Sequence, residues 1–91
     1  MAAKIEVTKN DEKTFTVRVT ESGTTSTHQV TVDSKYRAKV AGERAKPEEL
    51  IRKSFEFLLE REPKESILAR FDLTVISRYF PEYEREIKKR L

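Results

Sequence analysis

Residues 13–32 read KTFTVRVTESGTTSTHQVTV, and apolar and polar side chains alternate on both sides of Ser22-Gly23. The apolar residues at every second position are Phe15, Val17, Val19, Val30 and Val32. A period of two is typical of strands with one buried face. Glycine tolerates the positive φ that a tight turn needs, so Ser22-Gly23 predicts the turn of a β-hairpin.

The same alternation begins upstream, where Ile5 and Val7 precede a second turn candidate, Asn10-Asp11. We therefore expect an antiparallel three-stranded meander with strands over residues 3–8, 13–20 and 25–32. Its second face carries polar and β-branched side chains that can remain in water. They are Thr14, Thr16, Arg18, Thr20, Thr27, Gln29 and Thr31.

After residue 32 the pattern becomes helical. Asp33 suits a helix N-cap, and Gly42 can end the short segment that follows. Pro47 stands at the first-turn position of a longer helix that Pro63 limits. Its apolar residues at spacings of three and four are Leu50, Ile51, Phe55, Leu58 and Leu59.

Beyond Pro63 we expect short helices, one capped by Asp72 and the last begun by Pro81, so that the C-terminal half is helical throughout. The fold class is α+β, a three-stranded antiparallel meander followed by helices packed on one face of the sheet. Residues 1–91 then form a single domain, with the sheet in 1–32 and the helices in 33–91.

Composition limits the classes of protein. The sequence has no cysteine, which excludes disulfides and thiolate metal sites, and it has no apolar run of the roughly 20 residues that span a bilayer. We expect a cytoplasmic protein with no membrane partner. The net charge of +3 is spread over both halves, which is weak support for a nucleic-acid partner.

Catalytic motifs are missing from the sequence. The two glycines, Gly23 and Gly42, cannot build a phosphate-binding loop, and the single histidine, His28, excludes paired-histidine metal sites. His28 is in phase with the buried side of its strand, which favours a structural role over that of a general base. The acids Glu56, Glu60, Glu62 and Glu65 are typical of a solvated helix face. We expect no cofactor, no metal and no enzyme activity.

Two surfaces are candidates for interaction. Thr16, Arg18, Gln29 and Thr31 should lie together on the open face of the sheet. Aromatic side chains are densest around Tyr79 and Tyr83, together with Phe80 and Phe71. Aromatic residues at helical spacing usually belong to the core, and the alternative is a groove that binds a partner.

Two stretches resemble known families. Residues 27–62 contain THQVTV, then DSKYRAKV and KPEELIRKS, and resemble a ribbon-helix-helix DNA-binding unit of antitoxin type. In that family, strands from two chains enter the major groove, which implies base-reading roles for Gln29 and Thr31. The C-terminal half, from EELI through FPEYE, is similar to a family of short uncharacterised prokaryotic proteins, a resemblance that implies no activity.

These features predict a small non-enzymatic module that binds a protein partner or itself. An uncharged third strand left open at the sheet edge would favour a homodimer through that strand. The alternative is a nucleic-acid-binding regulator of ribbon-helix-helix type. An enzyme that uses His28 is a distant third.

Overall fold

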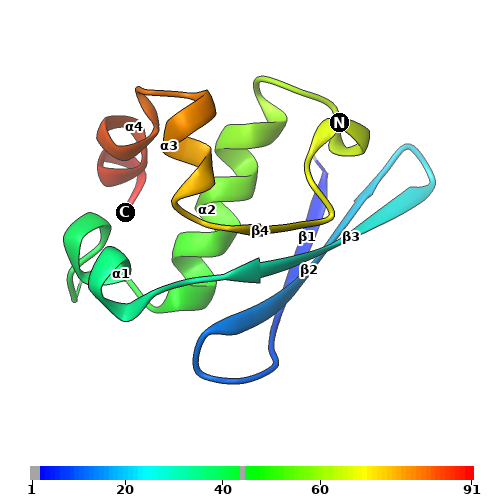
Figure 1. The fold of residues 1–91 in the computed structure, drawn as a ribbon. Coiled ribbons are helices and arrows are strands. Elements are labelled where there is room, and N and C mark those ends of the chain that lie inside the picture. Colours follow the sequence, from blue (N-terminus) through cyan, green and yellow to red (C-terminus); the bar gives the residue numbers. More distant parts are fainter. Residues whose placement is uncertain (1–2, 44) are drawn as a thin grey trace.

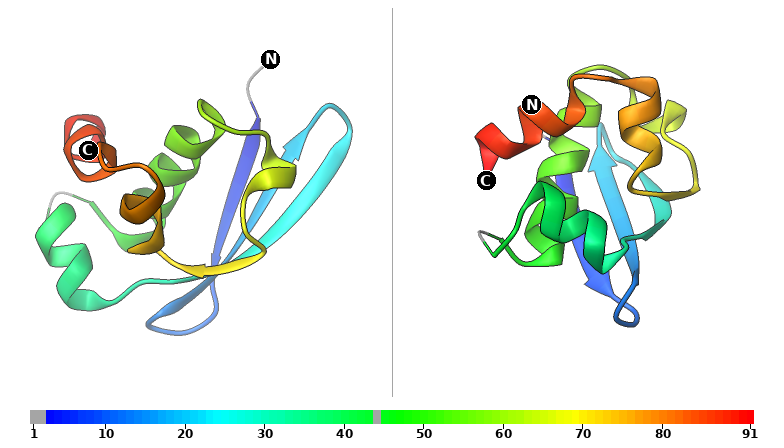
Figure 2. Two further views of the ribbon diagram at one scale, coloured as in Figure 1. Left: turned by 45° about the horizontal axis from the view of Figure 1, so that its top comes forward. Right: turned by 60° about the vertical axis from the view of Figure 1, so that its left-hand side comes forward.

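The computed structural model describes residues 3–43 and 45–91, which fold into a mixed sheet with helices on one of its faces (Figure 1). In chain order the elements are β1 (Lys4–Lys9), β2 (Thr14–Glu21), β3 (Thr24–Thr31), α1 (Ser34–Val40), α2 (Pro47–Leu59), the 3₁₀ turn η1 (Lys64–Ser66), β4 (Arg70–Asp72), α3 (Val75–Tyr79) and α4 (Tyr83–Arg90). The two views of Figure 2 show the helices gathered on the same side of the sheet.

The first three strands form the expected antiparallel meander, with each end within one residue of its expected position. Ser22 and Gly23 have φ of +55° and +80°, as the second turn requires. The first turn differs, because neither Asn10 nor Asp11 has a positive φ. Instead, the Asp11 carboxylate accepts hydrogen bonds from the backbone N–H groups of Lys13 and Thr14, both at 2.9 Å.

A fourth strand corrects the expected fold. β4 pairs with β3 in parallel, so the sheet has four strands and is mixed, and the C-terminal half is not helical throughout. The Gln29 N–H donates to the Ala69 carbonyl at 2.7 Å, and the Leu73 N–H donates to the Thr31 carbonyl at 2.9 Å. These bonds occupy the outer edge of β3 at residues 29–31, the edge through which we expected a homodimer to form.

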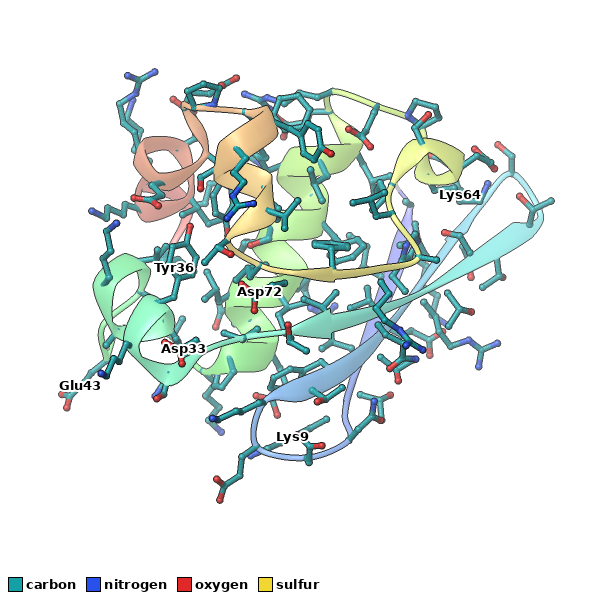
Figure 3. The ribbon with its side chains drawn as sticks, in the orientation of Figure 1. Lys9, Asp33, Tyr36, Glu43, Lys64 and Asp72 are labelled. Carbon is teal, nitrogen blue, oxygen red and sulfur yellow. The ribbon has the colours of Figure 1, made fainter. Side chains whose placement is uncertain are left out.

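The helix boundaries follow the local signals. The Asp33 carboxylate, labelled in Figure 3, caps α1 by accepting from the N–H groups of Lys35 and Tyr36. Gly42, with φ of +59°, follows α1 and donates its N–H to the Ala38 carbonyl. Pro47 begins α2 without a side-chain cap.

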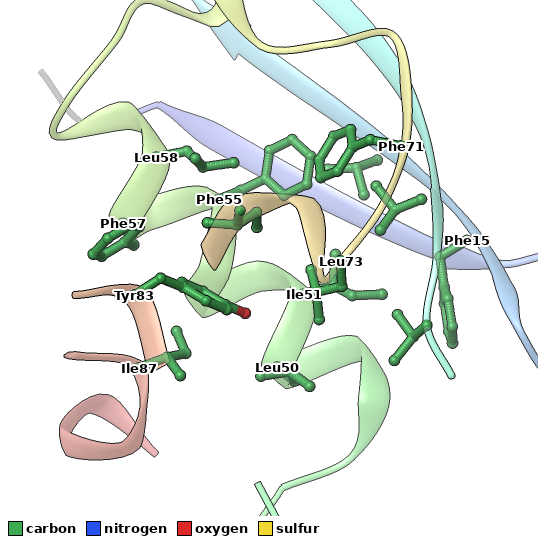
Figure 4. Close-up of a cluster of buried hydrophobic side chains, with 14 of the residues drawn as sticks. Phe15, Leu50, Ile51, Phe55, Phe57, Leu58, Phe71, Leu73, Tyr83 and Ile87 are labelled. Carbon is green, nitrogen blue, oxygen red and sulfur yellow. The ribbon is translucent and has the colours of Figure 1, made fainter. Parts of the chain in front are cut away.

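One hydrophobic cluster joins the sheet to the helices, with α2 at its centre (Figure 4). Phe55 is fully buried against the rings of His28 and Phe71, with centroid separations of 5.3 and 6.0 Å. On the neighbouring side of α2, Phe57 packs against Phe80 and Tyr83. α2 therefore supplies side chains both to the sheet and to the C-terminal helices.

Three hydrogen bonds join α4 and the residue before it to the end of α2. Arg90 forms two hydrogen bonds to the Glu60 carboxylate, at 2.6 and 2.8 Å. Arg61 lies over the Phe57 ring at 3.6 Å from its centroid and donates to Glu82 at 3.2 Å. Cation–π contact and bidentate pairing both restrict the geometry at the end of α2.

Replacing Phe55 with Ala should destabilise the protein by about 3 to 5 kcal/mol, because it removes a ring from the centre of a packed core. The free energy of unfolding in urea measures this loss. Tyr79→Ala is the control, because the Tyr79 side chain is 68% exposed and its removal should change stability by less than about 0.5 kcal/mol. Equal losses in the two variants would contradict the position of the core.

Candidate interaction groove

The open face of the sheet brings together the four residues expected there. Thr16 stands opposite Gln29, and their side chains hydrogen-bond at 3.1 to 3.2 Å. Thr31 donates its hydroxyl to Asp72 of β4 at 2.8 Å. Arg18 lies exposed, with Thr27 opposite it on β3. Much of the hydrogen-bonding capacity of this face is therefore satisfied within the protein.

The two tyrosines expected at one surface are separated by the structure. Tyr83 is fully buried, so its assignment to an interaction surface was wrong. Ser54 donates its hydroxyl to the Leu50 carbonyl at 2.7 Å, so the Tyr83 hydroxyl, 2.6 Å away, donates to the Ser54 oxygen. Burial raises the pKa of Tyr83 above its ordinary value. Tyr79, in contrast, is largely exposed.

Tyr79 lines an apolar groove of about 250 Å³ between the end of α2, residues 66–71 and α3 with Phe80. Figure 1 shows these segments side by side. Leu58, Phe71 and Ile76 contribute buried side chains to the groove. Leu68 and Tyr79 also line the groove. Both side chains are large and apolar, yet Leu68 is 48% exposed and Tyr79 is more exposed still. The groove thus joins exposed apolar surface to the hydrophobic core.

Glu62 is the one acidic residue in the groove lining. It follows α2, and its N–H donates to the Leu58 carbonyl, so its side chain lies at the negative end of the helix. Burial raises the pKa of the Glu62 carboxyl above the ordinary 4.5. We expected Glu62 on a solvated helix face, and its place in the groove corrects that expectation.

His28 occupies the inward position that the alternation predicts, and it is buried. Its Nδ1 lies 2.8 Å from the Leu68 carbonyl, which can only accept, so Nδ1 carries the proton. We therefore assign Nε2 as the acceptor of the Ser26 hydroxyl at 2.8 Å. Neither Ser26 nor His28 lines the groove.

A serine hydroxyl that donates to a histidine resembles a catalytic nucleophile with its base. Here the contacts of Ser26 and His28 instead have a structural role. The imidazole connects β3 to the residue that borders the groove. The alternation in the sequence predicts the inward position of His28. It does not predict the contact between His28 and Leu68, because the two residues are 40 positions apart.

Within residues 3–43 and 45–91, no group of three or more His, Cys, Asp or Glu side chains could hold a metal ion. In the same ranges, no helix has the length and apolar character needed to cross a bilayer.

Comparisons with family models, curated proteins and solved structures found no match. The two family resemblances noted in the sequence therefore gain no support from them.

Replacing His28 with Leu should destabilise the protein by about 1 to 3 kcal/mol, because the Leu68 carbonyl and the Ser26 hydroxyl lose their common partner. Amide hydrogen exchange should also accelerate around residues 67–69. Ser26→Ala is the matched control, since it removes one of the two bonds and leaves the bond to Leu68. Unchanged exchange in His28→Leu would contradict the positioning role.

Glu62→Gln should change how stability depends on pH. Because the folded protein raises the pKa of Glu62, wild type should lose stability relative to Glu62→Gln as pH rises through and above 4.5. Well below the ordinary pKa both proteins carry a neutral side chain, so the pH-dependent part of the difference should vanish. Urea titrations of both proteins from about pH 4 to about pH 7 measure it. A wild type that gains on the variant with rising pH would contradict this placement.

Proposed function

We propose that the protein is a non-enzymatic interaction module that binds a polypeptide segment in the groove bordered by Leu68 and Tyr79. The observation that carries the proposal is the exposure of these two side chains beside a hollow that reaches the core. The other large apolar side chains around them are buried or half-buried. Exposed apolar surface of this kind is typical of interaction sites.

The size of the groove favours a peptide anchor. At about 250 Å³ it is smaller than the roughly 300–1,000 Å³ of pockets that enclose small-molecule ligands. An apolar side chain of a larger partner can enter such a hollow while the rest of the segment covers Leu68 and Tyr79. Tyrosine also combines a large apolar area with a hydroxyl, which suits it to the centre of an interface.

The sheet supports other partners less well. A ribbon-helix-helix dimer pairs the same strand of two chains, but β4 already occupies the outer edge of β3 at Gln29 and Thr31. The open face presents Thr16, Arg18 and Thr27. None of these side chains is an aromatic ring on which a base could stack, so this face does not favour a nucleic-acid partner. We keep a cytoplasmic location as part of the proposal, because the sequence has no cysteine.

Selection from a random peptide library displayed on phage tests the proposal. Enriched peptides should carry a recurring large apolar residue. A synthetic copy of the most enriched peptide should bind Tyr79→Ala and Leu68→Ser at least about 10-fold more weakly than wild type, which corresponds to about 1.4 kcal/mol. Arg18→Ala, on the open sheet face, is the control and should bind as wild type does.

Two outcomes would contradict the proposal. Peptides that ignore Tyr79→Ala and Leu68→Ser but lose affinity for Arg18→Ala would move the site to the sheet. The second outcome would come from sedimentation of the free protein. A dimer that disappears in Tyr79→Ala would make a second copy of this chain, rather than another polypeptide, the occupant of the groove.

A further inference from the structure

We propose that the segment bound in the groove carries a lysine or arginine next to its apolar anchor, and that Glu62 pairs with this cation. The inference rests on the proposed function and names the chemistry of the partner. It depends on the position of one carboxylate in a largely apolar lining that contains no lysine or arginine.

Glu62 stands apart from the acids around it. In the part of the chain that the structure describes, the ion pairs use Glu56, Glu60, Glu65, Glu82, Glu84 and Glu86, and none of them includes Glu62. Glu60 shows the contrast, because it also lies at the end of α2 but receives Arg90 in a two-bond pair. The protein compensates one carboxylate at this helix end and leaves the other without a cation.

The nearest cations in the sequence point elsewhere. Arg61 lies over the Phe57 ring and bonds to Glu82 and to the Phe57 carbonyl. Lys64, labelled in Figure 3, is buried to 5% exposure of its side chain, with its ammonium group 2.5 Å from Glu65. Arg61 and Lys64 are therefore both engaged with other groups, and neither pairs with Glu62, so a bound segment would supply its cation.

An unpaired carboxylate is unfavourable in this place for two reasons. The lining removes part of its water, and the end of α2 presents carbonyl groups whose partial charge is negative. A cation from a partner relieves both costs, and it does so in a partly desolvated site where charge pairing is stronger than in open water. Arginine can form two bonds to a carboxylate, and lysine supplies a point charge.

The net charge of the protein does not by itself favour a basic partner. The chain has a net charge of +3, so its overall field does not attract basic peptides. Selection of a basic residue would then arise at Glu62 itself. A neutral or acidic residue at the same point would leave the carboxylate partly buried without a partner.

A double-mutant cycle tests the inference. The probe is the most enriched library peptide, made with an acetylated N-terminus so that its side chains are the sole cations. Glu62→Gln in the protein and Lys or Arg→Gln in the peptide should each weaken binding about 5- to 50-fold, and both changes together should weaken it no more than the larger single change. Glu12→Gln is the matched control and should leave affinity unchanged, because Glu12 is exposed in the turn between β1 and β2 and does not line the groove.

The outcomes separate the two proposals. Peptides that depend on Tyr79 but carry no recurring basic residue, or that bind Glu62→Gln as tightly as wild type, would overturn the role of Glu62 and leave the groove in place. Additive losses in the cycle would also overturn it, because they would show that the two charges do not meet. Peptides that do not depend on Tyr79 would overturn the proposed function itself.

Discussion

Hydrogen bonds between residues 69–73 and β3 position everything that follows them in the chain. β4 has three residues, yet it places Phe71 on the inner face against Phe55 and leads directly into α3. The His28 imidazole adds a bond to the Leu68 carbonyl just before this ladder. Residues 66–71, which form one wall of the groove, are therefore attached to the sheet. The position of α3, which forms another wall, follows from the direction in which the chain leaves β4.

The C-terminal helix completes the rigid frame behind the groove. Tyr83 of α4 reaches Ser54 inside α2, and Tyr36 of α1 donates its hydroxyl to Glu84 at 3.0 Å. Burial and the neighbouring Glu84 carboxylate raise the pKa of Tyr36, so this hydroxyl remains a donor. Together with the Arg90–Glu60 pair, these contacts give the polar groups between the helices hydrogen-bond partners within the protein. Leu68 and Tyr79 are large apolar side chains exposed to water, and Glu62 is a carboxylate in a largely apolar lining. Such departures from local preference are often found at functional sites.

The sequence predicts the elements whose signals are local. Alternation over residues 13–32 defines β2 and β3, and Asp33, Gly42 and Pro47 mark the boundaries of α1 and α2. β4 escapes prediction because three residues are too few to show a period, and because its partner lies some 40 residues earlier. The open face was predictable from the same alternation that gave the strands.

The groove was harder to predict for a related reason. Tyr79 and Tyr83 are four residues apart, which in one continuous helix would place them on the same face. Phe80 takes an extended conformation and separates α3 from α4, so one ring points outward and the other enters the core. Glu62 likewise belongs to an acid-rich run whose helix ends at Leu59, and only the folded chain shows that its side chain lies in the groove.

Nuclear Overhauser effects between the protein and a bound library peptide test the central claim most directly, because they identify which side chains touch the partner. The account predicts contacts from the apolar anchor of the peptide to Phe71, Ile76 and Tyr79, with the basic residue of the peptide next to Glu62. Contacts to Thr16, Arg18 and Thr27, with none to the groove, would contradict it.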